Sequence, residues 1–223
     1  MKKQALNRRQ LASEASKARI LNAAETLFSK KGLEGVSVRE IAAAAGLDLA
    51  MINYHFGSKL GLYRAVFHRR ADALTEERVS ELDRVLAGSA GKAPRLEDVV
   101  YALVAPNIFL RNNPDAGGVP FARIIVREMT DPNERDRGII SATFDETAQR
   151  FLQALALVFP TAPTAELHWA YHFAIGTLVQ TMASTGRLEV LSHGACQMSD
   201  PDVILERLIP FVVNGIRGCL ARF

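Results

Sequence analysis

Cysteine is scarce in this chain of 223 residues, which contains two, Cys196 and Cys219. Two thiols are too few for a disulfide framework or a cysteine-rich metal-binding site, so we interpret both as ordinary buried or half-buried thiols. Long apolar runs are also missing: no stretch of about 18 or more uncharged apolar residues occurs, so no membrane-spanning helix is expected. Residues 1–9 are basic and lack the apolar core of a signal peptide, so we expect a cytoplasmic protein.

The sequence also lacks the marks of a β protein and of common enzymes. Alternating segments rich in Val, Ile and Thr are absent, so nearly the whole chain is predicted to be helical. Residues 95–223 contain no Gly-rich phosphate loop, no Gly-x-Ser-x-Gly elbow and no His-Glu-x-x-His zinc motif. We therefore predict an all-α protein that is not an enzyme and carries no cofactor.

Basic charge is concentrated toward the N-terminus. Residues 1–60 contain ten Lys and Arg against five Asp and Glu, a net charge of +5, whereas residues 61–223 carry −2. A basic segment on a near-neutral body suits binding to a polyanion such as DNA, and it also suits a solubilising tail. Charge alone does not separate these two interpretations.

Helical periodicity and turn signals divide the chain. Apolar residues share one helix face from Ser16 to Lys31, and Gly32 ends that helix. Ser37 stands three residues before Glu40, the capping-box spacing that starts a helix. The pattern predicts helices at 16–31, 38–45, 49–56, 59–86, 95–112, 118–131, 135–159, 164–186 and 200–221.

The stretch from Val36 to Leu62 predicts two short helices joined by a glycine turn. Ile41 and Ile52 are spaced to form a shared core between them. A helix pair of this kind occurs as a plain packing motif, and it also occurs as a DNA-binding helix-turn-helix, whose second helix enters the major groove. The basic surplus of the segment favours DNA.

The predicted exposed face of the second helix suits base edges. Asparagine pairs with an adenine edge, and small apolar groups contact thymine methyl groups. The candidates for this role are Leu49, Ala50 and Asn53. Phosphates position such a domain without reading sequence, and polar groups that suit them flank the face. These are Ser37, Tyr54, His55 and Lys59.

The run from Ile20 through Val66, ILNAAETLFSKKGLEGVSVREIAAAAGLDLAMINYHFGSKLGLYRAV, resembles the DNA-binding domain of the TetR family of transcriptional regulators. The resemblance implies that Arg39 and the 49–53 face contact bases and that the flanking polar residues hold phosphates. Asn53 stands where many members carry an aromatic residue, so their operator preferences do not transfer to this chain.

Large apolar side chains are frequent in the middle helices of residues 95–186. Packing in a hydrophobic core accounts for most of them, but a helical bundle also leaves apolar pockets between its helices. The candidate pocket residues are Phe109, Phe121, Phe144, Phe151, His172 and Phe173, with Arg123 and Arg127 as polar anchors. An arginine at such a place receives a carboxylate or phosphate, or it pairs with a structural acid.

His168 and His172 are four residues apart, a spacing found in metal sites. Of the other ligand types only Glu166 is close in sequence, so we expect no metal and interpret the histidines as interior polar residues or pocket donors. An enzyme or carrier acting on a lipid-like molecule is the rival hypothesis. It needs an acid–base pair, such as His172 with Glu128.

Two C-terminal runs, AELHWAYHFAIGTLVQTM and RLIPFVVNGIRGCL, are similar to the C-terminal domain of TetR members that respond to fatty acids or acyl esters. The resemblance implies that helices 164–186 and 200–221 form a four-helix homodimer interface. Apolar residues on these helices provide more surface than one bundle needs. They are Leu178, Leu208, Phe211, Val212 and Ile216.

These inferences place a DNA-binding domain with a basic N-terminal arm at residues 1–60 and a helical ligand-binding and dimerisation domain at 61–223. The predicted function is a ligand-responsive transcriptional regulator, a repressor, that binds a palindromic double-stranded DNA operator as a homodimer. A small apolar effector, a fatty acid or acyl ester, releases it. A DNA-binding protein with a fully packed, ligand-blind bundle is the remaining alternative.

Overall fold

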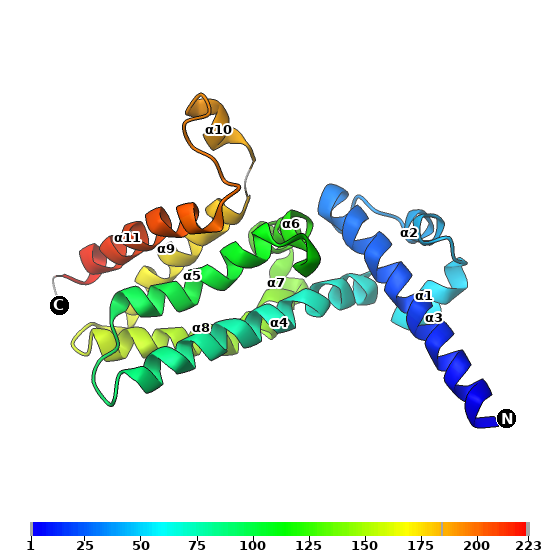
Figure 1. Ribbon diagram of the computed structural model, residues 1–223, viewed down its shortest axis with the longest axis horizontal. Coiled ribbons are helices and arrows are strands. Elements are labelled where there is room, and N and C mark those ends of the chain that lie inside the picture. The colour runs from blue at the N-terminus through cyan, green and yellow to red at the C-terminus, as the bar shows by residue number, and fades with distance from the viewer. Residues whose placement is uncertain (1, 184, 222–223) are drawn as a thin grey trace. The chain divides into compact units, whose positions relative to one another are not determined.

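The computed structural model describes residues 2–183 and 185–221, except for the side chains of residues 2–9, so the side chains of the expected basic arm lie partly outside the described residues (Figure 1). Every regular element in these ranges is helical, and the all-α fold predicted from the sequence is confirmed. The elements are α1 (Lys2–Lys31), α2 (Val38–Ala45), α3 (Leu49–Phe56), α4 (Lys59–Gly88), α5 (Leu96–Asn112), the 3-10 helix η1 (Pro114–Ala116), α6 (Gly118–Thr130), α7 (Glu134–Arg137), α8 (Ile139–Val158), α9 (Thr164–Ala183), α10 (Arg187–Leu191) and α11 (Pro201–Leu220).

The chain forms two compact units, residues 1–70 and 71–223. The first domain is predicted to end at residue 60, but the start of α4 packs within the first unit. Tyr63 is buried against Phe28 of α1, with the ring centroids 5.0 Å apart. Arg69 donates a hydrogen bond of 2.8 Å to the Asn22 side chain and forms an ion pair with Glu25.

Helix α1 starts well before the predicted limit at Ser16. Its first half is rich in Lys, Gln, Ala, Arg and Leu, which favour helix without an apolar face. The periodic signal begins only where burial begins, at Ile20, which is followed by Ala24 and Phe28 in the same core.

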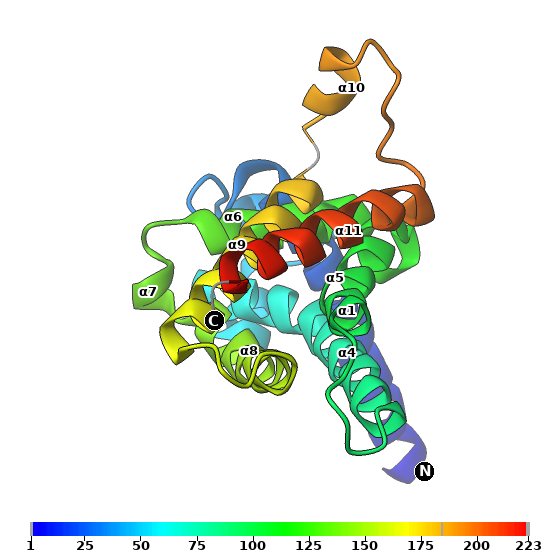
Figure 2. The ribbon, with the colours of Figure 1, turned by 90° about the vertical axis from the view of Figure 1, so that its left-hand side faces the viewer.

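In the second unit, α5 is the central helix, with twelve of its seventeen residues buried. Helices α6, α8, α9 and α11 pack around it. Figures 1 and 2 both show α11 lying beside α9, with α10 standing away from the two. No helix in the described part of the chain is long and apolar enough to cross a membrane.

Three local predictions differ from the structure. The helix expected at 135–159 is broken at Gly138, whose φ of 61° lies in the left-handed region that favours glycine. The helix expected at 164–186 ends at Ala183, and Gly186, with φ 73°, separates it from the short helix α10. Cys196 is exposed rather than buried because it lies in the connection between α10 and α11.

Candidate DNA-binding surface and effector cavity

Helix α2 begins with the capping box that the sequence predicts. The Ser37 hydroxyl accepts a hydrogen bond of 3.2 Å from the Glu40 amide, and the Ser37 amide donates one of 2.8 Å to the Glu40 carboxylate. Lys31 Nζ lies 2.7 Å from the same carboxylate. The hydrogen bond from Lys31, with those from Ser37, lowers the pKa of Glu40 from 4.5 to about 2. This charged cluster fixes the start of α2.

Gly46 makes the turn between α2 and α3. Its φ of 61° is left-handed, and a Cβ at this position would lie 2.9 Å from Arg19 Nη2. The same Arg19 nitrogen donates a hydrogen bond of 2.6 Å to the Ala45 carbonyl, so α1 holds the end of α2. Asp48 occupies the N-cap position of α3, but its side chain makes no capping hydrogen bond.

Helix α3 presents a continuous exposed face. Ile52 is fully buried and holds the helix to its unit, whereas Leu49 is 38% exposed and Tyr54 is 78% exposed. Ala50 and Asn53 are exposed on the same side. The structure therefore brings together the residues that the sequence predicts to face the bases.

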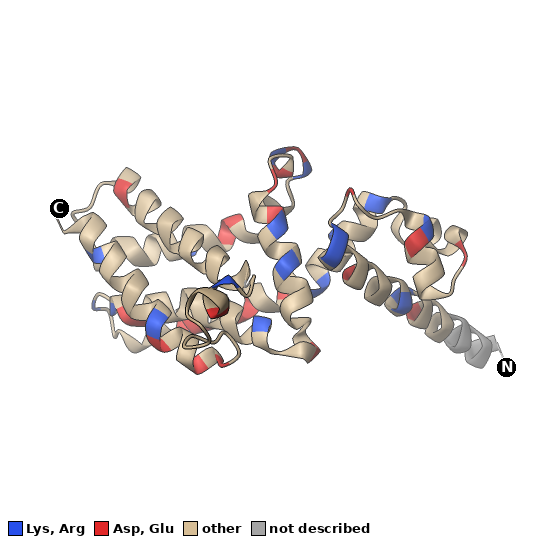
Figure 3. Ribbon diagram, turned by 90° about the horizontal axis from the view of Figure 1, so that it is seen from above, with Lys and Arg blue, Asp and Glu red and all other residues tan. Residues whose placement is uncertain are grey.

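Arg39 and the predicted phosphate contacts differ in how far their side chains are exposed. Arg39, the α2 candidate for base contact, is exposed, and Ser37 is exposed as well as capping α2. Lys59 is half-buried, with Nζ 3.7 Å from the Glu34 carboxylate. His55 is half-buried, and its Nε2 is buried without a hydrogen-bond partner among the described residues. Figure 3 shows in blue the Lys and Arg residues whose side chains are described.

The second unit contains a cavity of about 150 Å³, which we call the Arg78 cavity. Five helices, α4, α5, α6, α8 and α9, contribute to its wall, which is mainly apolar. The lining residues are Arg78, Asn107, Ile125, Met129, Ile140, Phe144, Asp145, Ala148, Tyr171, Ile175, Leu178, Val179 and Met182.

Arg78 is only 5% exposed, and no carboxylate of the described residues lies within ion-pair distance of it. Burial lowers the pKa of its guanidinium, and interaction with the Tyr171 hydroxyl opposes that change. The rings of Phe144 and Phe151 lie with their centroids 6.0 and 5.2 Å from Arg78 Cζ. Nε and Nη2 of Arg78 have no hydrogen-bond partner among the described residues.

Arg78 is not among the site residues predicted from the sequence, although a signal for it exists. Ala71, Leu74, Arg78 and Leu82 are spaced by three or four residues, and all four are buried. This spacing is that of one helix face. An arginine on an apolar face of a helix was therefore visible in the sequence, but the segment TEERVSELDR is so rich in charge that the helix looks solvent-exposed throughout.

The predicted ligand residues do not form one site. Phe144 lines the Arg78 cavity, and Phe151 contacts Arg78 from the core. Phe121 is fully buried but does not line the cavity, and Phe109 is 37% exposed. The two predicted anchors on α6, Arg123 and Arg127, are exposed and do not line the cavity.

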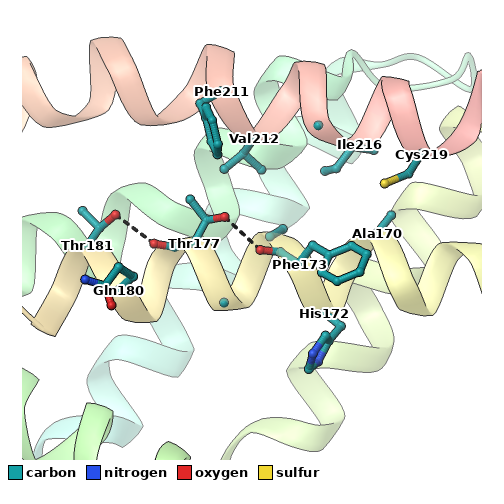
Figure 4. Close-up of a pocket in the computed structure, with 13 residues that line it drawn as sticks. Ala170, His172, Phe173, Thr177, Gln180, Thr181, Phe211, Val212, Ile216 and Cys219 are labelled. Carbon is teal, nitrogen blue, oxygen red and sulfur yellow. Dashed lines mark hydrogen bonds between the residues drawn. The ribbon is translucent and has the colours of Figure 1, made fainter.

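His172 and Phe173 lie instead at a groove between α9 and α11, shown in Figure 4 and called here the α9/α11 groove. Its volume is about 730 Å³, and the thirteen described residues that line it include no Lys, Arg, Asp or Glu. Phe211, Val212 and Ile216 of α11 point toward α9 in Figure 4, whereas His172 points away from α11. Phe173 and Phe211 are 55% and 67% exposed, and nearby Trp169 is 56% exposed.

Glu128 and His172, the acid–base pair considered for an enzyme, lie in different surroundings. Glu128 is 1% exposed and accepts a hydrogen bond of 2.8 Å from Arg137 Nε, whereas His172 is exposed on α9. Burial of Arg137 is outweighed by its bonds to Glu128 and Asp131, so the pKa of Arg137 is raised. Within the described ranges, no cluster of three His, Cys, Asp or Glu side chains is arranged to hold a metal ion.

Two family models match the chain. Residues 20–66 match the model for bacterial regulatory proteins of the tetR family, and residues 101–215 match the tetracyclin repressor-like C-terminal domain. The first match contains the helix-turn-helix, and the second covers more than half of the chain. Two helical units of this kind define a DNA-binding transcriptional regulator. The chain belongs to the TetR family.

Known proteins support the same assignment. The HTH-type transcriptional dual regulator CecR of Shigella flexneri is 30% identical over 125 residues, which is 55% of each chain, so the match spans about half the length of this relative. A TetR-family regulator from Bordetella parapertussis has a TM-score of 0.64 and 18% identity, over 89% of this chain and 94% of that one. FadR from Bacillus subtilis, in complex with stearoyl-CoA, has a TM-score of 0.58 and 16% identity, over 89% of this chain and 98% of that one. At these identities the structures share the fold.

Proposed function

We propose that this TetR-family chain is a ligand-responsive repressor that binds a palindromic operator as a homodimer and leaves it when a small molecule occupies the Arg78 cavity. The proposal rests on two features that occur in one chain. Helix α3 has an exposed face suited to contacting bases, and the second unit contains a cavity. The cavity also argues against a ligand-blind, fully packed bundle.

For DNA, we assign base contacts to Arg39, Leu49, Ala50 and Asn53. Phosphate contacts are assigned to Ser37, Tyr54, His55 and Lys59. The exposure of the α3 face supports the base contacts, and the basic surplus of residues 1–60 supports the phosphate contacts. The Ser37 oxygen accepts the capping bond, which leaves its O–H free to donate to a phosphate oxygen.

A second copy of the chain is the proposed occupant of the α9/α11 groove. Its wall is depleted of charge, and aromatic side chains are exposed beside it, as is usual at the core of a protein interface. Gly176, Gly215 and Gly218 leave open space where a Cβ would stand, so a partner helix can approach closely. A single half-site gives too little discrimination against a genome of competing sites, and a dimer supplies two.

The effector is expected to be compact. FadR of Bacillus subtilis, which shares the fold, was solved with stearoyl-CoA. The Arg78 cavity measures about 150 Å³, and an apolar cavity of about this size holds a benzene molecule. A short fatty acid or a single-ring compound fits this volume, whereas a long acyl chain does not.

Helix α4 is the proposed link between effector and DNA. It begins at Lys59, shortly after α3, the proposed recognition helix, and it carries Arg78 at the cavity. An effector that favours a shifted α4 changes the separation of the two recognition helices from the roughly 34–36 Å that adjacent half-sites require. Coupling of this kind is typically about 1–3 kcal/mol, a 5- to 150-fold change in affinity.

Release from the operator tests this proposal. The operator is selected from random duplexes, and its affinity is measured by fluorescence anisotropy during a screen of small acids, alcohols, esters and aromatic compounds. At least one compound should weaken binding by about 5- to 150-fold. Ala148→Leu, which fills the cavity, should abolish that release, while Ala142→Leu, an exposed position on the same helix, should retain it. Release that survives Ala148→Leu unchanged, or no release by any compound, contradicts the effector role.

A further inference from the structure

The unused hydrogen-bonding capacity of the Arg78 cavity defines the chemistry of its ligand. Arginine stays protonated in proteins, so a positive charge sits in a wall otherwise made mainly of apolar side chains. Arginines are almost never fully buried unless they are paired. No carboxylate of the described residues pairs with Arg78.

The two nitrogens without a partner are Nε and Nη2. Their N–H groups lie on one edge of the planar guanidinium and point in nearly the same direction. This edge matches the two oxygens of a carboxylate, which it binds through two parallel hydrogen bonds. The rings of Phe144 and Phe151 and the Tyr171 hydroxyl interact with the same guanidinium and limit its freedom to turn away.

We infer that the ligand of this cavity is a compact organic acid, whose carboxylate binds the Nε/Nη2 edge of Arg78 and whose short aliphatic or single-ring body fills the apolar remainder. The inference rests on the proposed function for the role of the cavity, and it adds the class of ligand. The volume of about 150 Å³ limits the body to about the size of a benzene ring.

The other polar groups of the wall are consistent with an acid. Asn107 is 4% exposed, and its Nδ2 donates a hydrogen bond of 3.1 Å to the Leu103 carbonyl within α5. Asp145 is the one acidic residue among the described lining residues. It is exposed, so water screens its charge, whereas Arg78 is buried. The field inside the cavity is therefore dominated by the buried cation.

Matched acids and alcohols test the inference. Benzoate and hexanoate are compared with benzyl alcohol and hexanol by titration calorimetry against the full-length protein. The acids should bind wild type more tightly than the alcohols, by about 10- to 100-fold for a charge-assisted pair of hydrogen bonds. Arg78→Met should remove this preference while leaving the alcohols nearly unchanged, and Arg78→Lys should restore part of it.

Arg123→Met is the matched control, because Arg123 is exposed and lies outside the cavity wall. It should leave the preference for acids intact. Equal binding of acids and alcohols to wild type, no binding of either acid, or an acid preference in Arg78→Met as large as in wild type would overturn the inference. If Arg78→Met does not fold, Arg78→Lys decides: an acid preference smaller than that of wild type upholds the inference, and an undiminished one overturns it.

Operator release separates this inference from the proposed function. Acids that bind through Arg78 without releasing operator DNA uphold the ligand class and contradict the effector role. Release by neutral compounds, with no binding of the acids, upholds the effector role and overturns the ligand class.

Discussion

The guanidinium carbon of Arg78 lies 5.2 Å from the centroid of the Phe151 ring, joining α4 to α8 in the second unit. A buried cation–π contact contributes about 2 kcal/mol. Taking an ion out of water costs several kcal/mol, so the two rings offset only part of the penalty. The remainder is a cost of burying Arg78 to the stability of the fold. Under the proposed function, a bound anion would offset this cost and so couple ligand binding to the packing of α4.

Asn53 is predicted to read a base. It lies on the exposed face of α3, where an asparagine amide pairs with an adenine edge. Asn53→Ala should weaken binding to the selected operator by about 1–3 kcal/mol and leave binding to random duplex nearly intact. Anisotropy titrations against both duplexes measure this. Equal losses of affinity for the two duplexes would show that Asn53 positions the domain on DNA or stabilises its structure and does not read a base.

Lys59 is predicted to contact a phosphate. Its Nζ is 3.7 Å from Glu34, a long and partly exposed pair that is worth little. Lys59→Ala should weaken binding to all duplexes and lower the slope of log affinity against log salt by about one unit. Lys92→Ala, at an exposed loop position of the second unit, is the control and should change neither quantity. An unchanged slope in Lys59→Ala removes the residue from the phosphate contacts.

Phe211 is predicted to lie in the dimer interface. It is 67% exposed in the single chain, so Phe211→Asp should keep the helical circular dichroism spectrum while yielding a monomer that does not bind operator. Ile216 is also predicted from the sequence to lie in the interface. It is only 3% exposed within the single chain, so an aspartate there would disturb folding as well.

Leu157→Asp is the matched control for Phe211→Asp, because Leu157 is 55% exposed on α8 and does not line the α9/α11 groove. Sedimentation equilibrium should show this variant as a dimer. A wild-type protein that sediments as a stable monomer at micromolar concentration would falsify the dimer proposal.

Glu40 is predicted to make stability depend on acid. Folding lowers the pKa of Glu40 from 4.5 to about 2. Its contribution to the free energy of unfolding is therefore fully present above pH 4.5 and is lost as the pH falls toward 2. Glu40→Gln keeps an oxygen for the Ser37 amide but loses the attraction to Lys31. The melting temperatures of wild type and Glu40→Gln should differ above pH 4.5 and converge near pH 2. A difference that stays constant across this range would contradict the assignment.

Local signals explain why the helix-turn-helix could be predicted from the sequence. The bounds 38–45 and 49–56 agree with the structure because a capping box and Gly46 mark them within a few residues. The break at Gly138 was missed because glycine is also tolerated inside helices. The all-α class followed from the missing strand patterns, which need no tertiary information.

The ligand anchor could not be predicted in the same way, because burial of an arginine is decided by the neighbouring helices. The buried face of α6 carries Phe121, Ile124, Ile125 and Glu128, which leaves Arg123 and Arg127 on the opposite, exposed face. On α4 the reverse holds, since Arg78 falls in line with Leu74 and Leu82. Which of these arginines meets a cavity depends on α8 and α9, which are distant in sequence.

The central claim is that this chain is a dimeric reader of a palindromic DNA site. Selection from a pool of random duplexes, followed by sequencing of the bound fraction, tests it most directly. The account predicts strong enrichment of an inverted repeat whose half-site centres are separated by about 10 base pairs, or by a multiple of one DNA turn. Enrichment of a single unpaired half-site, or retention of duplexes without any sequence preference, would contradict it.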